Sequence, residues 1–342
     1  MNMTNKINSI KLLTLLLLST IICAELFASE VNVYSGRKEK LIKPLLDEFS
    51  KETGVQVNLV TAKSSALLKR LELEAQSSPA DIFITVDVGR LHHAKKIGLF
   101  QKIDKESLVN VKEAYLDKEG YWVGLSKRVR TIVVDKKITE SEIKSFKDLT
   151  SGKFQNEICI RSSNNIYNQS MVASFLYHFG EKKTEKLMKK FVNNFARKPS
   201  GNDRAQIYSI LKGECSIAVV NHYYYARLVK SNEEKDKDIP NKTKIIFLDQ
   251  NDIGSHVNLS GVGIIKSSKN IKNANLLISF LLQKESQAWY AKVNNEYPVI
   301  EAAENNKILD SWGDVKMDIE SVSSLGELNA AAIKLMDRVG WQ

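Results

Sequence analysis

Three consecutive tyrosines follow an apolar run in the second half of the chain, and their phenol groups could bind a metal ion. The run at 216–220 has the length and composition of a buried parallel strand, and it leads into His222 and then into Tyr223, Tyr224 and Tyr225. Ligands of open α/β sheets bind at the carboxyl ends of the strands. A phenol has an ordinary pKa of about 10, so only a strongly Lewis-acidic cation displaces its proton at neutral pH. We therefore predict that this cluster binds Fe(III).

Two other interpretations of the tyrosines stay open. Adjacent tyrosines can be half-buried aromatics that keep only their hydroxyl groups in water. They can also stack on a small organic ligand, such as a phosphate ester or a thiamine-like compound. An enzyme is disfavoured, because the sequence has no Gly-x-Ser-x-Gly elbow, no P-loop and no convincing pairing of cysteine with histidine. We accordingly expect a binding protein without catalysis.

The segment 1–28 has the pattern of a signal peptide. Lys6 and Lys11 make its start basic, an apolar run covers 12–24, and small residues lead to Ala28. We predict cleavage after Ala28 and export to the periplasm. The chain has 342 residues and is 43% hydrophobic, which is enough for two lobes with separate cores.

The chain is basic, with a formal net charge of +10, but its lysines are scattered along the sequence. This scatter and the predicted export argue against a nucleic-acid partner. A basic surface suits an anionic partner or an anionic chelate of a cation. We expect the protein to be a monomer.

Two cysteines, Cys159 and Cys215, follow the predicted signal segment. An oxidising compartment would permit a disulfide between them. Direct bridging of neighbouring parallel strands is geometrically awkward, so the sequence leaves their pairing open.

Strands and helices alternate in the first third of the chain, which predicts a parallel sheet covered on both faces. Period-two or apolar runs predict strands, and apolar positions at helical spacing predict helices. The expected strands are 31–34, 55–60 and 81–86, and the expected helices are 41–53, 66–75 and 89–97.

Further on, the pattern indicates a second lobe and a return to the first. Two extended runs, 121–125 and 131–134, are separated by a polar stretch and are expected to be strands that cross into the second lobe. The segment 254–266 is expected to lead back, and 305–342 is expected to be helical and peripheral. The predicted domains are lobe one, 29–126 with 258–300, and lobe two, 127–257 with 301–342. Two lobes joined by two crossings suggest a hinged clamshell that closes over a ligand.

A third candidate ligand, Tyr167, follows the predicted strand 157–161. If this strand and 216–220 run parallel in one sheet, Tyr167, Tyr223 and Tyr224 lie on the same rim. Successive side chains of a true strand point to opposite faces, so Tyr223 and Tyr224 must lie where the strand ends and a helix begins. We expect Tyr225 to turn away into packing.

Several motifs together resemble one known family. Taken in order, they are the segments 78–87, 124–130, 160–164, 167–170, 195–199, 201–203, 223–224 and 255–263. In combination they resemble the ferric-iron-binding proteins of bacterial iron ABC importers, and most closely the subgroup that binds iron mainly through tyrosines. The resemblance covers essentially the whole chain after the signal segment.

This resemblance implies a two-lobed type II periplasmic-binding-protein fold of the α/β class. Each lobe would be a mixed, mostly parallel sheet flanked by helices, and two crossover strands would join the lobes. It implies no catalysis, but capture of Fe(III) and its delivery to an inner-membrane ABC permease.

The resemblance also implies roles for single residues. Tyr167, Tyr223 and Tyr224 take the positions of the tyrosine ligands. Arg128, with Arg130 as the alternative, resembles the arginine that offsets the charge of phenolates or of a synergistic anion such as carbonate or citrate. A guanidinium in this place lowers a neighbouring phenol's pKa and can hold an anion bidentately.

The sequence departs from the subgroup after its first strand. The subgroup often has a His-Tyr pair there, whereas this chain has Lys38 and Glu39. Lysine is protonated at neutral pH and is a poor iron ligand, while Glu39 could donate a carboxylate oxygen. Otherwise water or a small anion would complete the metal's coordination. Lys38 and His222 are further candidates for the surroundings of the metal or the anion.

Overall fold

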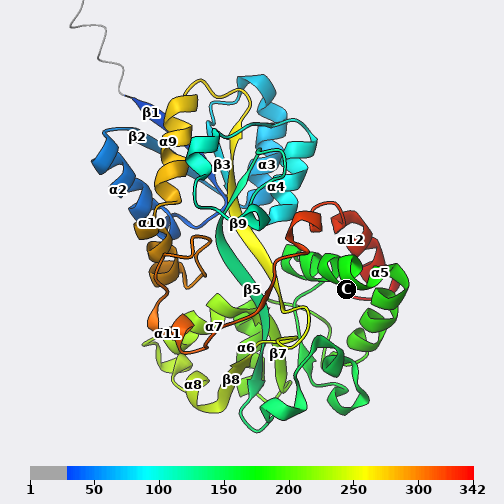
Figure 1. The fold of residues 1–342 in the computed structure, drawn as a ribbon. Helices are drawn as coiled ribbons and strands as arrows, with labels where there is room; N and C mark the ends of the chain where they lie inside the picture. Colours follow the sequence, from blue (N-terminus) through cyan, green and yellow to red (C-terminus); the bar gives the residue numbers. More distant parts are fainter. Residues whose placement is uncertain (1–28) are drawn as a thin grey trace, which may run out of the picture.

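Two long strands connect the two halves of the molecule. The computed structural model describes residues 29–342, so the predicted signal peptide at 1–28 and its cleavage site lie outside the described residues. Strands β5 (Val123–Asp135) and β9 (Ser255–Ile265) pair antiparallel and run from one half into the other (Figure 1). Each half is a sheet with helices around it, as the α/β clamshell prediction requires.

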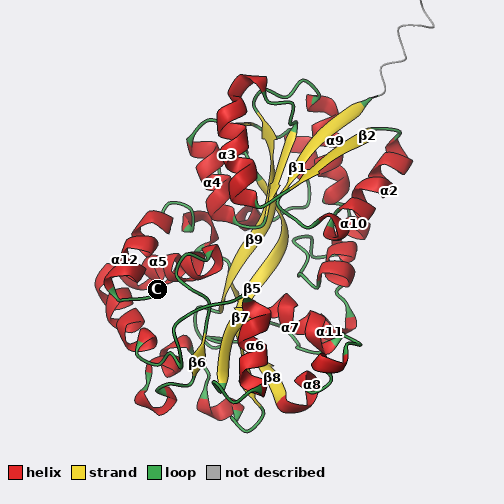
Figure 2. Cartoon of the chain, turned by 180° about the vertical axis from the view of Figure 1, so that it is seen from behind, coloured by secondary structure: helices red, strands yellow, loops and turns green. Residues whose placement is uncertain are grey.

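The first half contains the predicted parallel strands. Its sheet has the order β2-β1-β3-β9-β5, with β1 parallel to both β2 and β3, and β3 antiparallel to β9. Helices α2 and α9 lie on one side of this sheet and α3 and α4 on the other (Figure 2). The bounds are β1 Glu30–Ser35, β2 Gln56–Thr61, β3 Ile82–Thr85, β4 Phe100–Gln101, α2 Lys43–Thr53, α3 Ser64–Glu74, α4 Val88–Lys96 and α9 Ile271–Leu281.

The second half is built on the other ends of the long strands. Strand β5 pairs antiparallel with β7 and β8, and β6 pairs in parallel with β7. This parallel pairing confirms the arrangement expected for the strands that precede the tyrosines. The bounds are β6 Ile158–Cys159, β7 Ile217–Asn221, β8 Thr243–Ile246, α5 Ile166–Val192, α6 Asp203–Leu211, α7 His222–Val229 and α8 Ile239–Lys242.

The expectation of two separate runs at 121–125 and 131–134 is wrong, because β5 continues through the polar stretch between them. Arg128 and Arg130 are each only 4% exposed. Their charges are paired inside the protein, so a strand with a polar sequence can be buried here.

The C-terminal part is not peripheral, contrary to the sequence-based expectation. Helix α12 (Asn329–Arg338) lies beside α5 and joins its core (Figure 1). Trp341 is 2% exposed, and its indole nitrogen donates to the carbonyl oxygen of Arg161 at 3.1 Å. Helix α5 itself turns sharply at Gly180, whose positive φ of 71° suits a residue without a Cβ atom.

The chain between α9 and α12 packs across both halves. It contains α10 (Lys284–Trp289), a π-helical turn at Tyr290–Asn294, α11 (Lys307–Asp310) and the short strand β10 (Met317–Asp318), which pairs with β9. Within residues 29–342, no helix combines the length and the apolar character needed to cross a membrane.

A disulfide links Cys159 and Cys215, with their Cα atoms 5.9 Å apart. The sequence left this pairing open because paired positions of parallel strands are poorly placed for a bridge. Cys215 lies before the first residue of β7. The bond therefore joins β6 to the loop that precedes β7, and it does not have to link paired positions of two parallel strands.

Candidate metal centre

The three candidate tyrosines meet where two helices begin. Tyr167 is in the first turn of α5, and Tyr223 and Tyr224 are in the first turn of α7, directly after β7. Because β6 and β7 are parallel neighbours, both helices start at the same edge of the sheet. The rings of Tyr223 and Tyr224 have centroids 4.5 Å apart. Tyr225 points away from the pair, and its hydroxyl group donates to the carbonyl oxygen of Thr243 at 3.0 Å, as expected for packing.

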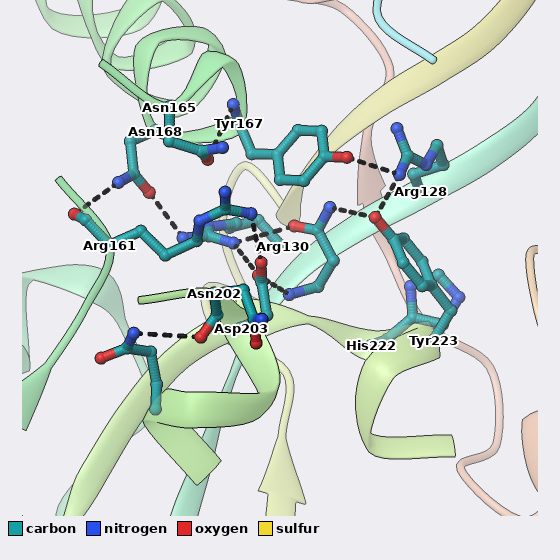
Figure 3. A network of polar contacts seen from close by, with 12 residues as sticks. Arg128, Arg130, Arg161, Asn165, Tyr167, Asn168, Asn202, Asp203, His222 and Tyr223 are labelled. Carbon is teal, nitrogen blue, oxygen red and sulfur yellow. Dashed lines mark hydrogen bonds and ion pairs between the residues drawn. The ribbon is translucent and has the colours of Figure 1, made fainter. Parts of the chain in front are cut away.

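Arg128 connects the tyrosines of the two helices. Its Nη2 atom donates to the hydroxyl oxygen of Tyr167 at 3.1 Å and also to that of Tyr223 (Figure 3). Its Nη1 atom donates to the carbonyl oxygen of Val86, which follows β3 in the first half. The guanidinium group therefore touches both halves of the molecule at the tyrosine cluster.

The phenols differ in how readily they lose a proton. Burial alone would raise the pKa of Tyr167, but the charge and hydrogen bond of Arg128 outweigh it, and the pKa is lowered. Burial raises the pKa of Tyr223 and of Tyr224, and negative charge on neighbouring phenols raises both further. Of the three phenols, Tyr167 is therefore the one that loses its proton most readily. A multiply charged cation between the oxygens would supply the positive charge that the other two phenols need to ionise.

Arg130 does not contact the phenols. Its guanidinium group donates to Asp203 at 2.8 Å, to Asn221 at 3.0 Å and to Asn168 at 2.5 Å. Of the two arginines that the sequence left as alternatives, Arg128 is the one that reaches the tyrosines. Arg161 also pairs with Asp203, at 2.7 Å.

The pairs around Asp203 hold the strand ends in place. Asp203 is fully buried and accepts from the backbone N–H of Asn221, the last residue of β7, at 3.1 Å. The side-chain amide of Asn221 donates to the hydroxyl oxygen of Tyr223 at 3.0 Å. These contacts fix the position of Tyr223 relative to the sheet (Figure 3).

Arg227 is a contributor that the sequence analysis missed. It lies one helical turn after the tyrosines in α7, and its guanidinium carbon is 5.2 Å from the ring centroid of Tyr223 and 5.9 Å from that of Tyr224. It donates to the carbonyl oxygen of Asn294 at 3.2 Å. Helical spacing from the tyrosines would have pointed to it, because residues three and four positions apart share a helix face.

His222 is buried beside the cluster rather than in it. Its Nδ1 atom lies 3.1 Å from the backbone nitrogen of Val129, and its ring meets that of Tyr223 edge-on with centroids 5.5 Å apart. Burial lowers the pKa of His222 to about 4, so the imidazole is neutral at pH 7. Its structural contacts are with strand β5 and the aromatic rings.

Among the described residues, Lys38 and Glu39 form no hydrogen bond with the tyrosines. Both side chains are exposed, and Glu39 begins a short 3₁₀ turn, Glu39–Leu41. Neither side chain forms a hydrogen bond or an ion pair within the part of the chain that the structure describes. The structure therefore brings together Tyr167, Tyr223, Tyr224 and Arg128, but not these two residues.

The sequence is similar to bacterial solute-binding and iron-binding proteins. The family of bacterial extracellular solute-binding proteins matches residues 77–314. Iron uptake protein A1 of Synechocystis sp. is 40% identical over 315 residues, which cover 92% of this chain and 88% of that protein. The major ferric iron-binding protein of Neisseria meningitidis is 26% identical over 278 residues, covering 79% of this chain and 81% of that protein.

Solved structures agree in fold over nearly the whole described chain. A Trichodesmium protein in complex with iron and citrate ligands is 41% identical, with a TM-score of 0.88 and coverage of 92% of this chain and 100% of that one. The ferric binding protein of Campylobacter jejuni is 35% identical, with a TM-score of 0.86 and coverage of 91% and 100%. Sequence and fold thus agree that the chain belongs to the bacterial extracellular solute-binding protein family.

Proposed function

We propose that this protein captures Fe(III) in its tyrosine cluster and delivers it to an inner-membrane ABC permease, without catalysing a reaction. The observation that carries the proposal is the meeting of Tyr167, Tyr223 and Tyr224 around the guanidinium group of Arg128. Phenolate oxygen is a hard donor, and three phenolates balance the charge of Fe3+. The names and ligands of the similar iron-binding proteins support this cargo.

The charges around the cluster favour an anionic chelate of iron as the form that arrives. Arg130 and Arg161 share a single carboxylate, Asp203, and Arg227 lies over the tyrosine rings with a carbonyl oxygen as its partner. Guanidinium charge therefore exceeds carboxylate charge beside the phenols. Such a site attracts ferric citrate or a ferric carbonate complex more strongly than the bare cation. Citrate or carbonate would then serve as a synergistic anion held by Arg128.

Capture then proceeds by exchange of protons for metal. Tyr167, Tyr223 and Tyr224 lose their protons and bind Fe(III), while Arg128 stabilises the negative charge that remains on the phenolates. The first half closes over the metal and brings Glu39 within reach of the open coordination position. Lys38 accompanies it and faces the anion. The closed form is the one that docks on the permease.

The proposed function includes export of the protein and a division into two lobes. Export through a signal peptide cut after Ala28 would put a monomeric protein in the periplasm. The lobes would be 29–126 with 258–300 and 127–257 with 301–342. The long strands β5 and β9, which run between the halves, support such a division.

Titration of the metal-free protein with ferric citrate tests the proposal directly. A broad visible charge-transfer band should appear, saturate near one iron per chain, and be lost or shifted in Tyr223→Phe. Tyr177→Phe is a matched control, because Tyr177 is 45% exposed and lies outside the cluster. Absence of a band in the wild-type protein would overturn the iron proposal and favour a small organic ligand.

A further inference from the structure

A buried carboxylate, Glu296, lies near Arg128 on the side away from the tyrosines, and it has no role in the chemistry described so far. It is 2% exposed and follows the π-helical turn Tyr290–Asn294. Both of its oxygens accept from Arg37, at 3.2 and 2.7 Å, and one also accepts from the hydroxyl group of Ser126 at 2.5 Å. Burying a charged carboxylate carries a large desolvation penalty, so a buried glutamate at this position suggests a specific role.

Glu296 also approaches the arginine that holds the tyrosines. One of its oxygens lies 3.5 Å from the Nε atom of Arg128. The far edge of the same guanidinium group donates to Tyr167 and Tyr223. One side chain therefore separates the carboxylate from the candidate ligands.

We infer that Glu296 is a positioning residue that aims Arg128 at the tyrosine ligands of the iron site. The inference rests on the proposed function, since it assigns Glu296 a role in the same site.

The geometry shows how this positioning works. Carboxylates tend to pair with arginine through two parallel hydrogen bonds, which would occupy an edge of the guanidinium group. Here Arg37 donates to both oxygens of Glu296 and Ser126 to one of them, whereas Arg128 approaches with a single, longer contact through Nε. Both Nη atoms of Arg128 stay free for Val86 and the phenols. Glu296 thus attracts Arg128 without drawing it away from the tyrosines.

Arg37 is itself held firmly, which keeps Glu296 in place. It follows Gly36, where a Cβ atom would lie 1.8 Å from the side-chain oxygen of Ser64, so the loop packs closely on α3. Its guanidinium carbon lies 5.0 Å from the ring centroid of Tyr290. Like charges on Arg37 and Arg128 would repel each other without the carboxylate between them. The chain of contacts ties the loop after β1 to the tyrosines of the second half.

The charge of Glu296 persists over the working pH range. Burial alone would raise its pKa, but the charges of Arg37 and Arg128 and the hydrogen bonds from Arg37 and Ser126 lower it to about 2. The carboxylate therefore acts as a fixed anchor rather than as a group that titrates.

Glu296→Gln tests the inference, because the amide keeps the shape and removes the charge. Its NH2 group would face guanidinium groups, and Arg128 would turn from its present orientation. We expect the ferric charge-transfer band to shift in wavelength, and citrate to remove the iron at a concentration on the order of tenfold lower than for wild type. A purely structural role would lower the melting temperature and leave both readouts unchanged.

Asp81→Asn provides the matched control. Asp81 is also 2% exposed and accepts several hydrogen bonds, among them one from Ser268 at 2.7 Å, but it lies directly before β3 and forms no hydrogen bond with the cluster. This variant should lose stability and keep the wild-type band. Ser126→Ala, which removes one contact of Glu296, should give a smaller shift in the same direction as Glu296→Gln.

The outcomes separate the inference from the proposed function. A wild-type band together with an unchanged band and citrate sensitivity in Glu296→Gln overturns the positioning role and leaves the iron proposal intact. If Glu296→Gln does not fold, an unchanged band in Ser126→Ala overturns the role instead. Absence of a band in wild type overturns the iron proposal itself.

Discussion

Arg128 is the residue whose charge most directly favours phenolate at the site. Replacing it by lysine keeps one positive charge but loses the fork that reaches Tyr167, Tyr223 and Val86 together. We expect Arg128→Lys to weaken Fe(III) binding by about ten- to a hundredfold, the range of a charge-assisted hydrogen bond of about 1.5–3 kcal/mol. Competition with citrate measures this loss. Arg70→Lys, at a surface pair with Glu74, should bind iron as wild type does. Equal affinities of Arg128→Lys and wild type would contradict this role.

The protonation of the phenols sets the direction of the pH dependence. Tyr223 and Tyr224 have raised pKa values in the metal-free protein, so both are protonated at pH 7. Binding of iron must displace these protons, and each displaced proton lowers the affinity about tenfold for each unit of falling pH. We expect release of at least about two protons per iron at pH 7 and loss of iron on acidification. Calorimetry in buffers with different ionisation enthalpies counts the protons. An affinity that is flat from neutral to acid pH would rule out phenolate binding.

Only part of the site could be predicted from the sequence. Tyr167, Tyr223 and Tyr224 each come after a predicted strand, so their types and places relative to the strands indicated a common rim. Asp203 and Glu296 gave no such signal, because their partners are far away in the chain and only the fold brings them together. A residue's role in orienting another side chain depends on contacts of this kind, and a single sequence does not display them.

The disulfide stabilises the part of the second half that carries the tyrosines. It ties β6 to the loop before β7, the two strands that precede the tyrosine-bearing helices. Replacing Cys159 and Cys215 by alanine frees a loop with a sequence separation of 56 residues. We expect a loss of about 2–4 kcal/mol in the free energy of unfolding, measured by denaturant titration. The ferric band of the folded variant should match that of wild type, since the core cluster that contains both cysteines includes none of Tyr167, Tyr223 and Tyr224. A variant as stable as wild type would show that other contacts suffice to hold the two strands.

Predictions of elements succeeded where the pattern was local and failed where burial depended on distant partners. The alternation of strand and helix over the first three strands is confirmed, because each apolar face is visible within a few residues. The polar stretch inside β5 was mistaken for a break, since Arg128 and Arg130 are buried only through pairing with residues far along the chain. The C-terminal segment was expected at the periphery, yet Leu335, Met336 and Trp341 join the core beside α5. Helical spacing could have predicted the apolar face of α12, but it could not predict that this face packs against α5.

Strands β5 and β9 hold the two halves together, and Arg128 of β5 reaches Val86 in the first half. Binding of iron should therefore draw the halves together, and small-angle X-ray scattering should show a smaller radius of gyration in the ferric form than in the metal-free form. Closure is also the step at which the exposed first-half residues Lys38 and Glu39 would act.

Lys38 and Glu39 are adjacent but carry opposite charges, so their substitution should have different effects on iron binding. Glu39→Gln removes a carboxylate that would complete the coordination of the metal, so we expect weaker iron binding, by several-fold to about tenfold, with the charge-transfer band still present. Lys38→Gln removes a positive charge, so it should weaken binding only when citrate or carbonate is present as the partner anion. Both variants alter exposed side chains and should fold as wild type does. If Glu39→Gln and wild type bind iron equally well and close to the same radius, the first half closes without supplying a ligand, and water or the anion fills that position.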